Sequence, residues 1–224
     1  MKKIEKIFSN TKFMMTVGIL AAIICFVRHI PYAFLPDYPE FKFDFLAEIA
    51  LPLLIVFLLI AFKKGETNIQ KTLLGALLFF LVSMNFPYGI YYIEDYFLGG
   101  YDASWLYYGI IYTISGVMEV GIFVSHCLLQ SDHIGSNKLV VLNRLFCAVV
   151  ICVYVFDIFH SFVFEDIYLN NEYMLDSIAE ILLIVMVICM ETKIQMYKKI
   201  RTEAISSGTW TSEEKAKAKE LFRK

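Results

Sequence analysis

The sequence predicts an all-α, polytopic integral membrane protein with six transmembrane helices, and three observations support that prediction. First, 58% of the 224 residues are hydrophobic and 19% are charged, which is far from the composition of a soluble domain. Second, six apolar stretches each have about the 17–25 residues that a helix needs to cross a hydrocarbon core. Third, the loops between these stretches alternate in the sign of their charge. We expect helices because a lipid-exposed backbone must satisfy its own hydrogen bonds.

The expected spans leave little of the chain outside the bilayer. They are residues 13–33, 44–62, 72–93, 104–130, 139–164 and 174–192. We therefore expect a six-helix transmembrane domain over 1–192 and a basic cytoplasmic tail over 193–224. In the tail, Ser206-Ser207-Gly208 should end the last long helix, and Thr211 should begin a short helix as its cap. The tail is then either a solvated stub or a docking element for a cytoplasmic protein or for anionic lipid headgroups.

Charge is distributed unequally between the two sides of the expected bundle. Of the 20 Lys and Arg residues, 18 fall on the side of the two termini. The opposite side carries ten acids and a single lysine, Lys42. By the positive-inside rule, both termini face the cytoplasm and the protein lies in the cell (plasma) membrane. The ten acids are Asp37, Glu40, Asp44, Glu94, Asp95, Asp102, Glu165, Asp166, Glu172 and Asp176.

A weak internal repeat links the second and sixth expected spans. Asp44-Phe-Leu-Ala-Glu48-Ile-Ala-Leu51 and Asp176-Ser-Ile-Ala-Glu180-Ile-Leu-Leu183 share five of eight positions. The pattern is consistent with three repeated helical hairpins, and equally with chance similarity among helices rich in Ile and Leu.

Eight polar or ionisable residues within the expected spans are the candidates for ligand binding. A charged residue at depth costs about 2.5–3.5 kcal/mol on insertion scales, so each acid there needs a proton, a cation or water. Among the candidates, the single arginine, Arg28, cannot neutralise the four acids Glu48, Glu119, Asp157 and Glu180. Asp157 and His160 share a helix face, and Ser115 lies one turn before Glu119. The eight candidates are Arg28, His29, Glu48, Asn85, Glu119, Asp157, His160 and Glu180.

Three interpretations of these residues stay open at this stage. In the first, the residues pair across helices and only fix the packing. In the second, they line a water-filled pocket open to the outside. In the third, they form an intramembrane catalytic or redox site. In the last case Asp157 and His160 would be the acid–base pair. His29 and His160 are also of a type that binds zinc or iron, but no His-x-x-Glu or Glu-x-x-His pair is present, so metal and cofactor stay unknown.

Several function classes are not expected. The chain has no Gly-rich phosphate loop, no serine nucleophile elbow and no HExxH motif. Its basic residues stand in short runs at helix ends, as membrane topology requires, so nucleic acid is not an expected partner. The lipid bilayer is the expected environment, while a cytoplasmic protein at the tail and self-association stay open.

We therefore expect a small membrane protein whose outward-facing acidic and polar pocket binds or transports a cation or a small polar ligand. The acidic outer side would concentrate cations and repel anions. The alternative is a non-transporting sensor or partner subunit that docks a cytoplasmic protein through its tail. An intramembrane enzyme ranks third.

Overall fold

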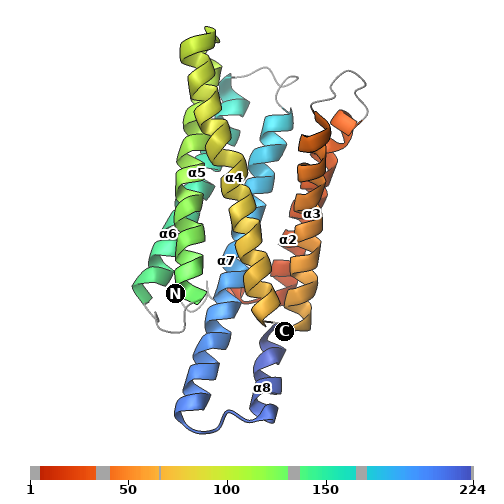
Figure 1. Cartoon of the computed structure of the whole chain (residues 1–224), viewed down its shortest axis with the longest axis vertical. Helices are drawn as coiled ribbons and strands as arrows, with labels where there is room; N and C mark the ends of the chain where they lie inside the picture. The colour runs from red at the N-terminus through yellow and green to blue at the C-terminus, as the bar shows by residue number, and fades with distance from the viewer. Residues whose placement is uncertain (1–5, 34–40, 66, 131–136, 165–170, 223–224) are drawn as a thin grey trace. The chain divides into compact units, whose positions relative to one another are not determined.

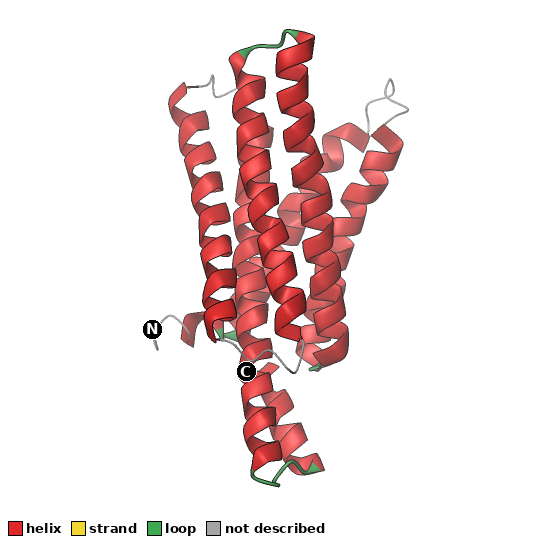
Figure 2. Ribbon diagram, turned by 60° about the vertical axis from the view of Figure 1, so that its left-hand side comes forward, coloured by secondary structure: helices red, strands yellow, loops and turns green. Residues whose placement is uncertain are grey.

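Each of the six apolar stretches forms a helix in the computed structural model of the chain, which describes residues 6–33, 41–65, 67–130, 137–164 and 171–222. Helix α7 continues past the apolar stretch, as expected from its sequence. No strand occurs within these ranges (Figures 1 and 2). The long helices are α2 (Thr11–Ala33), α3 (Phe41–Lys64), α4 (Thr67–Gly99), α5 (Ala103–Gln130), α6 (Asn137–Phe164) and α7 (Asn171–Ser206).

Three of the described helices are long and apolar enough to cross a membrane. They span Asn68–Gly99, Ala103–Gln130 and Asn137–Val163, with 32, 28 and 27 residues. Thr11–Val27 is a shorter apolar helix. These lengths are compatible with a membrane protein. Six crossings stay a prediction.

Helix α6 shows the distribution of side chains that suits a helix in lipid. Large apolar residues are exposed, whereas the polar ones are buried. The exposed residues include Val141, Leu145, Phe156, Phe159 and Phe162. Asn143, Asp157 and Ser161 are 1%, 3% and 6% exposed. This is the reverse of the pattern of a soluble helix, and it is the pattern expected of a helix with apolar surroundings, where polar groups need partners inside the protein.

The chain divides into two compact units. The terminal unit comprises Met1–Leu74 and Val185–Lys224, and the central unit comprises Gly75–Ile184. Helices α4 and α7 each contribute to both units. These units are defined by contacts within the structure. The predicted division at residue 192 instead separates a membrane part from a cytoplasmic part, and it stays a prediction.

Polar residues and glycines define the helix ends. Asn10 Oδ1 accepts the backbone N–H groups of Lys12 and Phe13 at the start of α2. At the start of α5, Asp102 Oδ1 accepts the hydroxyl of Ser104 and, at 2.9 Å, its backbone N–H. The hydroxyl bond, and then the backbone bond, hold the pKa of Asp102 below its usual value. Gly100, directly after α4, has a φ of 69°, a left-handed conformation that glycine adopts without strain.

Glycines let α4 and α5 approach each other closely inside the central unit. A Cβ atom on Gly89 of α4 would lie 2.5 Å from the backbone nitrogen of Thr113. A Cβ atom on Gly116 of α5 would lie 2.7 Å from the Cα atom of Phe86. Such contacts require glycine, since the clashing atoms belong to the backbone. The small residues therefore bring the two helix backbones together at the level of the candidate site.

The C-terminal tail folds back onto the terminal unit. Helix α8 (Ser212–Lys219) is followed by the 3₁₀ turn η1 (Glu220–Phe222), and the pair lies beside the last turns of α7 (Figures 1 and 2). Phe222 is fully buried, with its ring centroid 5.9 Å from that of Phe62 and 5.5 Å from that of Tyr197. The interpretation of the tail as a solvated stub is therefore wrong: its last aromatic ring is a core residue of the terminal unit.

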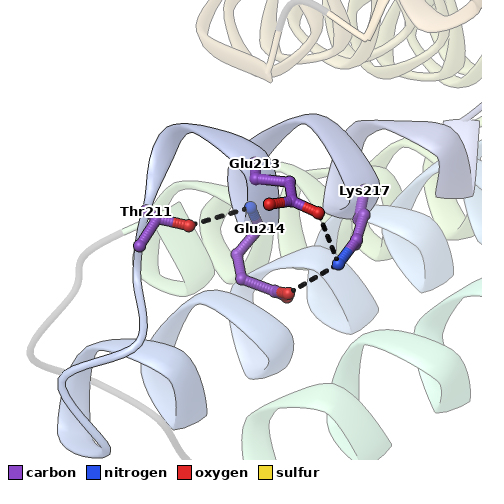
Figure 3. A network of polar contacts seen from close by, with 4 residues as sticks. All are labelled: Thr211, Glu213, Glu214 and Lys217. Atoms are coloured by element: carbon purple, nitrogen blue, oxygen red, sulfur yellow. Dashed lines mark hydrogen bonds and ion pairs between the residues drawn. The ribbon is translucent and has the colours of Figure 1, made fainter.

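The start of α8 matches the predicted cap. The side chain of Thr211 accepts the backbone N–H of Glu214, and Lys217 forms ion pairs with Glu213 and Glu214 at 3.1 and 3.2 Å (Figure 3). The two glutamates raise the pKa of the exposed Lys217 above its usual value. These are surface contacts, so the cap and the buried ring contribute more to holding the tail in place than the ion pairs do.

A buried lysine also holds the tail. Lys193 of α7 has no exposed surface, and its Nζ atom donates to Thr11 Oγ1 at 2.6 Å and to the carbonyl oxygen of Leu221 at 2.7 Å. Both acceptors are neutral. Burial lowers the pKa of Lys193 from 10.5 to about 8. One amine thus connects the start of α2, the middle of α7 and the end of the tail.

Candidate functional site

A buried carboxyl–amide pair lies at the centre of the candidate site. Glu119 of α5 has no exposed surface, and Asn85 of α4 is 5% exposed. The amide nitrogen of Asn85 donates to both carboxyl oxygens of Glu119, at 2.8 and 3.0 Å. The amide is neutral, so it satisfies the oxygens of Glu119 without balancing a negative charge.

A second carboxyl lies within electrostatic range of the first. Glu180 of α7 is 7% exposed and is close enough to Glu119 for the two charges to interact. The ring of Tyr154 on α6 is 1% exposed and lies within electrostatic range of both acids. We call Asn85, Glu119, Tyr154 and Glu180, together with Ser115, the acidic cluster. It takes residues from all four helices of the central unit.

Two buried hydroxyl groups belong to the acidic cluster. Ser115 is fully buried, and its side chain lies within hydrogen-bonding range of the Tyr154 hydroxyl. Apart from each other, Ser115 Oγ and Tyr154 Oη have no hydrogen-bond partner among the residues that the structure describes. The two hydroxyls therefore place neutral hydrogen-bonding groups beside the carboxyls.

Local sequence explains why these side chains meet. Ser115 and Glu119 are one turn apart on the buried face of α5, and Gly116 brings that face against α4. On α4, Pro87 lies two residues beyond Asn85 and has no N–H, so the carbonyl of Ser83 loses its helical donor. The site thus lies where the backbone of α4 is locally interrupted and where two helices approach most closely.

The chain offers few positive charges to this part of the molecule. Lys138 and Arg144 are the Lys and Arg residues of the sequence 75–184. Both precede Tyr154 on α6, by 10 residues or more, which is about 15 Å along a helix. The basic side chains of the central unit are therefore remote from Glu119.

A second polar group lies one helical turn from the acidic cluster, toward the turn at Gly100 between α4 and α5. We call that end of the central unit the Gly100 end. Asp157 of α6 is 3% exposed. It accepts a hydrogen bond from Tyr107 of α5 at 3.0 Å and another from Ser177 of α7. The ring of His160 stacks on that of Tyr107, with centroids 4.0 Å apart. These four residues are the Asp157 cluster.

On the other side of the acidic cluster, the same four helices carry aliphatic residues. Moving one turn away from the Gly100 end leads from Asn85 to Leu81, from Glu119 to Ile122, from Tyr154 to Val150 and from Glu180 to Leu183. Their exposed fractions are 1%, 0%, 0% and 0%. We call these four residues the aliphatic layer. Polar groups return only beyond it, where Asn143 donates to Ser125 at 2.7 Å.

The structure brings five of the eight predicted residues into these two groups. Asn85, Glu119 and Glu180 meet in the acidic cluster, and Asp157 and His160 meet in the neighbouring one. The side chains of Arg28, His29 and Glu48 lie outside the described residues, although their backbones belong to α2 and α3. The test of the predicted repeat, which pairs Glu48 with Glu180, lies outside them as well.

Two members of the Asp157 cluster, Tyr107 and Ser177, are not among the residues that the sequence indicated. Ser177 precedes Glu180 by three residues and so shares its helix face, which is the available signal. Tyr88, three residues beyond Asn85 on α4, is 41% exposed, so it does not extend the buried polar cluster.

Comparison with known proteins adds no assignment. No family model, no curated protein and no solved structure matches the chain. Within the described ranges, no group of three or more His, Cys, Asp and Glu side chains is arranged to hold a metal ion. The function is therefore argued from the two polar clusters themselves.

Proposed function

We propose that the protein is a six-span membrane protein, with both termini in the cytoplasm, that binds or transports a cation at the acidic cluster. The observation that carries this proposal is the pair formed by Glu119 and Glu180. Two carboxyls with little or no exposed surface lie within electrostatic range of each other, and the donor to Glu119 is a neutral amide. A bound cation would compensate the negative charge of the pair.

A purely structural role explains these observations less well. A carboxyl–amide pair alone would fix the packing of α4 against α5. It would not require a second acid beside the first, because like charges repel in a medium of low dielectric constant. Ionisable groups within spans are costly and usually serve binding or transport.

The test is cation uptake into proteoliposomes that contain the full chain. Radioactive sodium and rubidium ions and a pH-sensitive dye report the movement of three cations. Glu119→Gln should reduce the flux of the transported cation about 10- to 100-fold, the loss expected when one charged contact worth 1.5–3 kcal/mol is removed. Asp157→Asn should reduce it too, because Asp157 is the buried acid of the neighbouring polar cluster.

The matched control is Glu94→Gln, which removes the same charge from an exposed position of α4. It should leave uptake unchanged. Each variant is first checked by gel filtration for a folded, monodisperse protein. Unchanged uptake of all three cations in both Glu119→Gln and Asp157→Asn would refute the proposal.

A further inference from the structure

The arrangement of the polar clusters and the aliphatic layer is asymmetric along the central unit. From the Gly100 end, polar groups follow one another down to Glu119. One turn beyond Glu119, all four helices turn to aliphatic side chains that are 0–1% exposed. A charged species therefore meets hydrogen-bonding groups on one side of the carboxyl pair and a layer without polar side chains on the other.

The spacing between the two clusters suits the transfer of protons. Asp157 follows Tyr154 by three residues on α6, and Ser177 precedes Glu180 by three residues on α7. Because α6 and α7 run in opposite directions, both steps lead from the Asp157 cluster to the acidic cluster. A step of three residues is about 4.5 Å along a helix, a gap that one water molecule can bridge.

The burial of the carboxyl pair favours the smallest cation. Glu119 has no exposed surface, and both of its oxygens accept from Asn85. A metal ion would need several further oxygen ligands around it, whereas one of two carboxyls whose charges interact can hold a proton without any change in its surroundings. The groups described near the pair include Asn85 of α4, Ser115 of α5 and Tyr154 of α6. These three are neutral at physiological pH.

We propose that the cation held by Glu119 and Glu180 is a proton, and that it reaches them from the Gly100 end through the Asp157 cluster. This inference rests on the proposed function. Asp157 gives up a proton that the Glu119–Glu180 pair gains. Each hydroxyl between them, on Ser177 and Tyr154, accepts one proton on its oxygen and releases its own, so both end unchanged. The aliphatic layer stops the proton from passing farther.

Infrared spectroscopy of the full chain in liposomes tests whether a proton is held. Titration toward alkaline pH should remove the C=O band of a protonated carboxyl and produce carboxylate bands. Glu119→Gln and Glu180→Gln should each abolish this change, while Glu94→Gln should retain it. Two variants are used so that a folding defect in one does not decide the result. A titration that is the same in all four proteins would overturn the inference.

Proton leakage tests whether the aliphatic layer is the barrier. Under an imposed membrane potential, Ile122→Thr should raise proton influx about tenfold, the change expected when one hydrogen bond lowers a barrier. Val120→Thr is the matched control, because it adds the same hydroxyl to an exposed position of α5. Equal influx in the two variants would contradict a barrier at this layer.

The two proposals fail in different ways. Suppose that sodium or rubidium uptake depends on Glu119 but no carboxyl band titrates. The bound cation is then not a proton, so the inference falls and the proposed function stands. If the band titrates with Glu119 and Glu180 while tracer uptake does not depend on them, the inference stands and the proton is the cation. If neither measurement depends on Glu119, both proposals fall.

Discussion

At the scale of single residues, the chain buries ionisable groups among neutral partners. Glu119 accepts from an amide, and Lys193 donates to a hydroxyl and a backbone carbonyl. Neutral partners satisfy hydrogen-bonding capacity without fixing the charge state. Such a group responds to a proton or an ion more readily than one held in a buried salt bridge, where removing the partner leaves an uncompensated charge.

Docking of the tail should strengthen as the pH rises from about 8 to 10.5. The pKa of Lys193 is about 8 when the tail is docked and 10.5 when its amine is in water. Between these values the undocked form binds more protons, so raising the pH favours the docked form. Trp210, whose ring lies 6.3 Å from that of Tyr197, reports docking by fluorescence in a Trp105→Phe background.

The control for this measurement is Lys193→Met, which keeps an unbranched side chain and removes its amine and charge. Any pH dependence of its fluorescence comes from titration of the tyrosines, and this background is subtracted from the wild-type profile. The remaining change in the wild type should be absent from the variant. If wild type and Lys193→Met have the same profile, the amine does not link docking to pH.

At the scale of the elements, the glycine contacts between α4 and α5 position the acidic cluster. Gly116→Ala should destabilise the protein by about 1–3 kcal/mol, because its Cβ atom would overlap the backbone of Phe86 and the helices would have to separate. It should also weaken any function of Glu119 by moving Asn85 away. Thermal unfolding in detergent measures the first effect, and cation uptake measures the second.

Gly75→Ala is the matched substitution for this prediction. Its Cβ atom would lie 3.6 Å from the nearest atom, an ordinary contact with the side chain of His126. The variant should unfold at the wild-type temperature or slightly above it, since alanine favours the helix. Equal effects of the two substitutions would show that close approach of α4 and α5 is not required.

The order of the helices could be predicted from apolar length, and the tail helix from its cap. Each predicted stretch lies within an observed helix, but the helices extend past it, as α4 does from Thr67 to Gly99 around the expected 72–93. The acidic cluster was predictable only in part. Glu119 stands out because acids are costly in apolar stretches, but its pairing with Asn85 depends on how Gly89 and Gly116 set the packing of α4 against α5, which no periodicity reveals. The burial of Phe222 also escaped prediction, because it depends on Phe62 and Tyr197, far away in the sequence.

At the scale of the whole molecule, the expected topology can be measured by single-cysteine labelling. The five native cysteines are replaced, and cysteine is then placed at Tyr101 or at Thr209. In intact cells, a membrane-impermeant maleimide should label the first variant only. The second should react after the membrane is permeabilised, because positive charge keeps that side in the cytoplasm. Labelling of Thr209→Cys in intact cells would contradict a cytoplasmic tail.

The contact between Thr11 and Phe222 joins residues 211 positions apart. During synthesis the start of α2 can make this contact only after residue 222 has left the ribosome. The ring of Phe222 becomes buried when the tail docks. The seating of the tail is therefore a late step of biogenesis, and an exposed Phe222 would mark molecules that have not completed their maturation.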